Sequence, residues 1–120
     1  MAIFISEPVK VVAAGTGNKI IDEFFGLAST NDSAISIARM KSPSGWFEPG
    51  QTPEFDEYSF VLRGYLQVET KQGVIEVHAG QAIHTFKGEW IRYSTPGKDG
   101  AEYLAICLPA FSPNTVKRDS

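Results

Sequence analysis

Residues 45–64 read GWFEPGQTPEFDEYSFVLRG and carry the strongest signal for the fold. From Glu57 to Thr70 the chain is rich in aromatic and β-branched residues, the composition that strands favour. Gly64 interrupts this run, and a glycine inside a strand pattern indicates a bulge or a backbone with positive φ. We therefore predict two strands within residues 57–70 that meet at Gly64.

The rest of the chain repeats this pattern of short strand-like runs closed by turn signals. Further strands are predicted at Ala34–Met40, on each side of Ala79-Gly80, within 89–95 and over 101–108. The segment Asn18–Phe25 fits either a short helix or an edge strand, and the polar tail after Ala110 is expected to lie along the surface or to fray. Strands at intervals of about 8–12 residues predict an all-β sandwich or barrel.

Length and composition narrow the classes of function. The chain has 120 residues, 42% of them hydrophobic, which suits one domain with a real core. A net charge of −3 with scattered basic residues argues against nucleic acid as a partner. No signal peptide or transmembrane-length run is present, so we expect a cytoplasmic protein with no membrane partner. We predict a single domain over residues 1–120 with its core at about 30–110.

A first motif is framed by glycines at both ends. After Gly45 it places Gln51, Pro53, Glu57 and Gly64 at fixed intervals. The spacing is that of a metal-binding motif, yet the stretch contains no histidine. The spacing of the glycines is therefore evidence about the fold, and the missing histidines are separate evidence about the function.

A second motif follows, with Gly80, Gly88 and Ile91 at matching intervals. The two motifs together resemble those of the cupin superfamily (RmlC-like), and residues 52–64 are similar to the cupins of ethanolamine-utilisation operons. The resemblance implies an all-β, cupin-like double-stranded β-helix, a jelly-roll barrel. It also implies a small single-domain member of that family.

Cupins with a metal usually hold it by three histidines and one glutamate, which the resemblance aligns with Gln51, Pro53, Glu57 and Ile91. Pro53 and Ile91 have no ligating side chain, and two oxygen ligands do not make a transition-metal site. We therefore expect neither the usual metal nor another cofactor. The alternative is a displaced metal site, with Glu54, Asp56, Glu57, His78 and His84 as its candidate ligands.

Strand alternation predicts which side chains face the interior. If Glu57 points inward, Ser59 and Val61 share its face. The residues between them would face outward, and they are too apolar for open solvent: Tyr58, Phe60 and Leu62. An apolar outer face predicts a second layer or, as small cupins commonly form, a homodimer.

The later strands add further predictions of facing. Ile91 and Tyr93 are expected to point inward and Arg92 outward. The last strand points in either Tyr103, Ala105 and Cys107 or Glu102, Leu104 and Ile106. Cys107 is expected to be a buried, inert thiol.

Glu57 is the main candidate for catalysis. A carboxyl group among apolar neighbours has a raised pKa and can act as a general acid or base; the alternative is a structural carboxylate that holds the motif loop. Metal-free cupins that epimerise sugar nucleotides pair a histidine with a tyrosine, and the nearest analogue would be His84 with Tyr93. The candidate ligand-binding residues are Gln51, Glu54, Trp46 and Trp90, although both tryptophans also suit core packing.

Two classes of function follow. One is a metal-independent isomerase, epimerase or lyase that acts on a polar metabolite. The other is a non-catalytic module that binds or senses a metabolite. In both, the partner is a small molecule, and a displaced-ligand metalloenzyme is the minor alternative.

Overall fold

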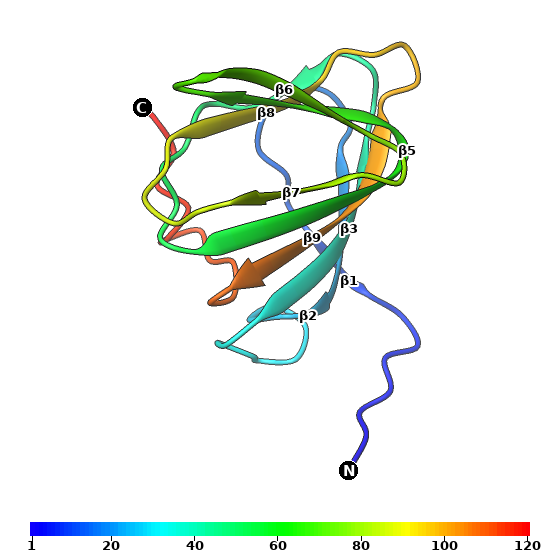
Figure 1. The fold of residues 1–120 in the computed structure, drawn as a ribbon. Helices are drawn as coiled ribbons and strands as arrows, with labels where there is room; N and C mark the ends of the chain where they lie inside the picture. The colour runs from blue at the N-terminus through cyan, green and yellow to red at the C-terminus, as the bar shows by residue number, and fades with distance from the viewer.

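The computed structural model describes residues 1–120 and contains nine strands and no helix. Figure 1 shows the strands curled into a barrel, with the N-terminal residues extending away from it. The strands are β1 (Val9–Val11), β2 (Ile20–Phe25), β3 (Ser36–Ser42), β4 (Trp46–Phe47), β5 (Asp56–Thr70), β6 (Gly73–His78), β7 (Ala82–Thr85), β8 (Ile91–Thr95) and β9 (Ala101–Leu108).

The long strand β5 joins the two sheets of the barrel. Its first half pairs with β7 and β9, and its second half pairs with β6 and β8. The larger sheet therefore has the order β1-β2-β3-β9-β5-β7, and the smaller sheet has the order β6-β5-β8-β4. All pairs are antiparallel, and the two inner faces oppose each other.

The two strands predicted to meet at Gly64 are one bent strand. A register shift lies between Val61 and Arg63, and Gly64 has a φ of +70°. A Cβ atom at Gly64 would collide with the carbonyl oxygen of Gly100, so only glycine fits where the strand changes partners. The glycine of the first motif thus shapes the barrel.

The other predicted strands are confirmed as β3, β6, β7, β8 and β9, with boundaries shifted by a few residues. The helix alternative for Asn18–Phe25 is wrong. Residues from Ile20 to Phe25 form β2, which hydrogen-bonds to β1 on one side and β3 on the other. Pairing on both sides satisfies the backbone hydrogen-bonding groups of this segment, whereas an isolated helix of this length would be only marginally stable.

Burial alternates along the central strands as predicted. Glu57, Ser59 and Val61 are buried, whereas Tyr58, Phe60 and Leu62 are 41–44% exposed on the outer face. Ile91 and Tyr93 point inward and Arg92 does not. The last strand takes the first of its two alternatives, with Tyr103, Ala105 and Cys107 buried.

The C-terminal tail is tied to the barrel. In the C-terminal tail, Val116 is 3% exposed and packs in a small second core with Phe55 and Cys107. Backbone hydrogen bonds join Glu54 to Thr115 (2.8 Å) and Gly50 to Asp119 (2.8 Å). The tail lies along the surface as expected and does not fray, and its one buried side chain, Val116, closes one end of the core.

Candidate functional site

A cavity lies between the two sheets, with a free volume of about 60 Å³. That space suits several water molecules or one small ligand. Most of its wall is apolar, and it includes Val11 and Val12 from the N-terminal segment and Phe111 and Val116 from the tail. The polar side chains that face it are Lys19, Glu23, Ser36, Glu48, Gln51, Glu57, Tyr93, Tyr103 and Arg118.

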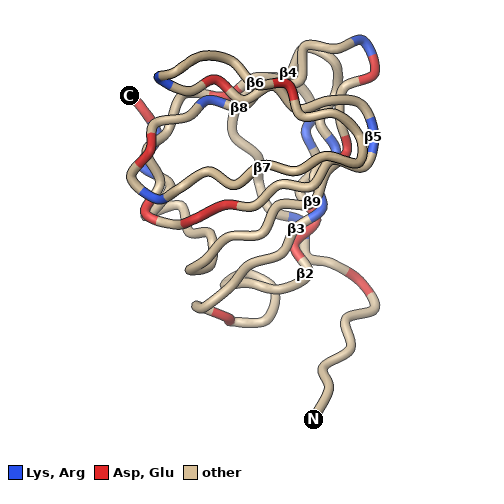
Figure 2. Tube along the Cα trace, in the orientation of Figure 1, with Lys and Arg blue, Asp and Glu red and all other residues tan.

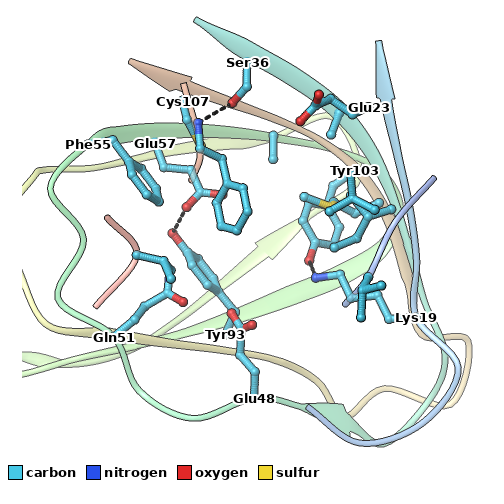
Figure 3. A pocket seen from close by; sticks show the side chains of 18 of the residues that line it. Lys19, Glu23, Ser36, Glu48, Gln51, Phe55, Glu57, Tyr93, Tyr103 and Cys107 are labelled. Atoms are coloured by element: carbon cyan, nitrogen blue, oxygen red, sulfur yellow. Dashed lines mark hydrogen bonds between the residues drawn. The ribbon is translucent and has the colours of Figure 1, made fainter. Parts of the chain in front are cut away.

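Glu57 and Tyr93 meet across the barrel (Figure 3). Tyr93 on β8 donates a hydrogen bond to Glu57 Oε1 over 3.3 Å, and its hydroxyl lies 2.9 Å from Thr85 Oγ1. In the ladders of the larger sheet, Glu57 is the direct partner of Thr85 on β7 and of Cys107 on β9. Strand register on one sheet and a tyrosine from the other therefore hold this carboxyl group.

The surroundings of Glu57 disfavour its charged form. Burial raises the pKa of Glu57 to about 7, the nearby carboxyl of Glu48 adds to the rise, and Lys19 and the Tyr93 hydrogen bond oppose it. Burial and the charge of Glu57 raise the pKa of Tyr93 well above its ordinary value. Near neutral pH, Glu57 can both donate and accept a proton, while Tyr93 stays a neutral donor.

Lys19 brings an amine into the same cavity from the residue before β2. Its Nζ atom lies 2.7 Å from the Tyr103 hydroxyl and 3.6 Å from the centre of the Trp46 ring. Burial lowers the pKa of Lys19 to about 8, although Glu48 and Glu57 favour its charged form. The sequence reasoning missed Lys19, because a lysine at the start of a segment predicted as a short helix or an edge strand is expected to face solvent.

A second charged group of residues closes the cavity on the side of the tail. Arg118 Nη2 lies 3.5 Å from Glu48 Oε2, and Glu48 is 6% exposed. Burial raises the pKa of Glu48, while Lys19 and Arg118 oppose that rise. The sequence reasoning missed both residues, because Glu48 lies at no consensus position of the motif and Arg118 lies in the tail.

Gln51 lies where the resemblance placed a metal ligand. Its backbone pairs with Ile91, with hydrogen bonds of 2.9 Å in both directions. Its side chain faces the cavity, is 3% exposed, and its Oε1 atom has no hydrogen-bond partner in the protein. A buried acceptor without a partner is costly, and it is well suited to receive a hydrogen bond from a bound molecule.

His84 does not join this site, and the predicted His84–Tyr93 pair is wrong. His84 is the strand partner of Tyr58 and shares its outward direction. Its ring stacks on Tyr58 and Phe86, with ring centres 4.0 Å and 3.9 Å away, and Nε2 lies 3.6 Å from Asp56 Oδ1. Thr85, one residue later, takes the inward position beside Tyr93.

The other candidate ligand-binding residues lie outside the cavity wall. Trp46 is buried behind it, where its Nε1 donates to the Ala14 carbonyl over 3.1 Å and its ring contacts Lys19. Trp90 donates to Asp119 Oδ2 over 2.9 Å near the tail. Glu54 is exposed in the loop before β5. Trp46 thus supports the site indirectly, and Trp90 and Glu54 do not contact it.

The residues present do not fit the metal of the fold family. At the aligned positions only Gln51 and Glu57 offer donor atoms, both oxygens, where iron, manganese or nickel would be expected to draw on imidazole. No three histidine, cysteine, aspartate or glutamate side chains gather in a geometry that could hold a metal ion. The displaced ligand set does not converge either, since His78 pairs with Glu76 on the exposed surface and His84 lies on the outer face.

Solved structures of other proteins share this architecture. The polyketide cyclase RemF from Streptomyces resistomycificus superposes with a TM-score of 0.77 at 17% identity, covering 100% of this chain and 85% of that one. An ethanolamine utilization protein Q from Salmonella typhimurium LT2 gives a TM-score of 0.62 at 21% identity, covering 78% and 71%. No protein-family model matches the chain.

One curated protein is similar in sequence. It is the endoribonuclease YbeY of Myxococcus xanthus (strain DK1622), 39% identical over 102 residues, which are 85% of this chain and 35% of that protein. The chain therefore spans about a third of the length of this relative. The strand topology and the structural neighbours together show a cupin-like double-stranded β-helix, which is the fold that the sequence predicted.

Proposed function

We propose that this protein binds a small polar molecule in the cavity between its two sheets, and that Glu57 exchanges a proton with it. The observation that carries the proposal is the buried Glu57 carboxyl, held by Tyr93 and facing a cavity that also contains the unpartnered Oε1 of Gln51. An apolar pocket with a few convergent polar groups is the usual form of a small-molecule site.

The reaction class that suits these groups is metal-independent proton transfer, as in an isomerase, an epimerase or a lyase. Glu57 would be the general acid or base, because a pKa of about 7 lets either form exist near neutral pH. Tyr93 and Gln51 would orient the polar groups of the substrate. The alternative is a non-catalytic module that binds or senses the same molecule.

Ligand screening followed by isotope exchange separates these two functions. We would measure thermal melting of the protein with a panel of small polar metabolites, and then follow each stabilising compound by ¹H NMR in D₂O. If the protein is a catalyst, a substrate C–H signal should disappear as its proton exchanges with deuterium. This exchange should stop in Glu57→Gln and continue in the control Glu54→Gln, since Glu54 is exposed outside the cavity. Stabilisation without exchange supports the binding module, and no stabilising compound overturns both.

Nucleic acid is not the proposed partner. Figure 2 shows lysine and arginine interspersed with aspartate and glutamate along the chain, which supports this view because phosphate binding requires a concentrated basic face. The residues matched in the Myxococcus endoribonuclease are only 35% of that protein, and its activity is not proposed for this chain. The structure contains no helix of the length and apolarity needed to cross a membrane, and a cytoplasmic location stays a prediction.

A further inference from the structure

We propose that Lys19 forms a covalent imine with a small aldehyde or ketone bound in the cavity. This inference rests on the proposed function, since it assigns a substrate class to the same cavity. Lys19 lies outside both sequence motifs and directly before β2.

The position of the Lys19 amine supports this role. Lys19 lines the cavity, and its Nζ atom is fixed between the Tyr103 hydroxyl at 2.7 Å and the face of Trp46 at 3.6 Å. Trp46 is itself held by a hydrogen bond to Ala14, within the segment that leads to Lys19. No carboxylate oxygen pairs with this amine within 4.0 Å, unlike Lys10, which pairs with Asp22 at 3.0 Å.

The surroundings also permit the neutral amine that attack on a carbonyl requires. Burial lowers the pKa of Lys19 to about 8, against the opposing effect of Glu48 and Glu57. Burial raises the pKa of Tyr103, so its hydroxyl keeps a proton. That hydroxyl can accept a hydrogen bond from the ammonium and donate one to the neutral amine, so Nζ stays in place in either form. A desolvated lysine is a recognised imine-forming nucleophile.

The step balances without an oxidant or reductant. The nitrogen lone pair attacks the carbonyl carbon, the carbonyl oxygen takes a proton, and a carbinolamine forms. The carbinolamine nitrogen gives up one proton and the protonated hydroxyl leaves as water, so the C=N bond forms as a protonated imine that keeps one proton on nitrogen. Of the three carboxyl groups that face this cavity, Glu23 accepts hydrogen bonds from the backbone of Ala28 and Ser29. Glu48 and Glu57, whose charges act on Lys19, are the two that can carry those protons. A protonated imine makes the adjacent C–H bond acidic, and Glu57 would remove and return that proton.

Reductive trapping tests the proposal on the wild-type protein. The protein at pH 8 would be incubated with glycolaldehyde or pyruvate and sodium cyanoborohydride, and the modified residues would be identified by peptide mass spectrometry. The chain has six other lysines, which serve as internal references. We expect Lys19 to be labelled at least about tenfold faster than any of them with one of the two probes. Lys19→Arg should lose this fast labelling, and Lys10→Arg should leave it unchanged.

The outcomes separate this proposal from the function on which it rests. Equal labelling of all lysines with both probes overturns the imine. The non-carbonyl counterparts, ethylene glycol and lactate, are tested in thermal melts alongside the metabolite panel. If compounds without a carbonyl stabilise the protein while Lys19 stays unlabelled, the imine fails and binding in the cavity stands. If nothing stabilises the protein and Lys19 is unlabelled, both proposals fail.

Discussion

Tyr93 reaches from the smaller sheet to Glu57 on the larger sheet, and its hydroxyl donates a hydrogen bond to the Glu57 carboxyl over 3.3 Å. The two residues are 36 positions apart in sequence. Both are almost fully buried, so the bond joins the two sheets inside the cavity and also positions the proposed acid or base.

Removal of the Tyr93 hydroxyl tests this link. Tyr93→Phe leaves Glu57 and Thr85 without a partner, so we expect the free energy of unfolding to fall by about 1–3 kcal/mol. The pKa of Glu57 should rise further, because the Tyr93 hydrogen bond lowers it. Denaturant unfolding and carboxyl ¹³C NMR titration measure the two effects. Tyr58→Phe on the outer face is the matched control, and an equal loss there would contradict the link.

The raised pKa of Glu57 predicts how stability depends on pH. The folded protein holds this proton up to a pKa of about 7, whereas the unfolded chain releases it near the ordinary value of 4.5. Stability is therefore greatest below pH 4.5 with respect to this group and falls as pH rises to 7, by up to about 3 kcal/mol. Glu57→Gln should flatten this part of the profile, measured by urea unfolding between pH 5 and 7.5.

Two neighbouring groups bear on that measurement. Burial raises the pKa of Glu48 and so adds a loss of the same sign, which Glu57→Gln leaves in place. Lys19 acts in the opposite direction. Its pKa is lowered to about 8 in the folded protein, so with respect to this group stability rises as the pH increases from 8 to 10.5. Glu54→Gln should keep the wild-type slope. A wild-type stability that rises between pH 5 and 7 would contradict the assignment.

Cys107 should be unreactive in the folded protein. Its thiol is buried beside Glu57, and burial raises its pKa above the ordinary value. Because the thiolate is the reacting form, we expect the disulfide reagent DTNB to react on the order of a hundredfold more slowly than with a free thiol. Ser120→Cys provides an exposed thiol for comparison. Equal rates for the two thiols would show that this end of the barrel opens readily.

The buried valine of the C-terminal tail should contribute to stability. Val116 packs with Phe55 and Cys107, and Val116→Ala would remove two methyl groups from this small core. We expect a loss of about 2 kcal/mol in the free energy of unfolding. Val74→Ala on β6 is the control, since Val74 is 59% exposed. Similar effects at the two positions would indicate that the tail detaches in solution.

The outer face of β5 leads to a prediction of assembly. Tyr58, Phe60 and Leu62 remain 41–44% exposed there, so the homodimer predicted from the sequence stays a prediction with this face as its interface. Light scattering after size-exclusion chromatography would give the mass. We expect a dimer that Phe60→Glu dissociates and Val74→Glu does not. A monomeric wild-type protein would refute it.

The positions of most strands and the facing of the side chains on β5 and β8 could be predicted from the sequence, whereas the facing of β9 was left open. Period-two alternation from Glu57 and the glycine frame from Gly45 to Gly88 depend on local geometry, which each residue type restricts by itself. The resemblance placed Gln51, Glu57 and Ile91 at inward positions, and alternation along the strand then placed Tyr93 on the same side as Ile91. The prediction failed at His84, whose facing depends on the register between β5 and β7.

The membership of the cavity was decided only by the tertiary structure. Lys19 and Arg118 come from segments with no motif, and Glu48 lies at a non-consensus position of the first motif. A charged side chain in each of these places is expected to face solvent from the local sequence. The three side chains meet because β2 docks on β3 and the tail packs over Phe55. The sequence determined the barrel through local backbone constraints, whereas the chemistry of its interior arises from contacts between distant segments, and only the folded chain brings those together.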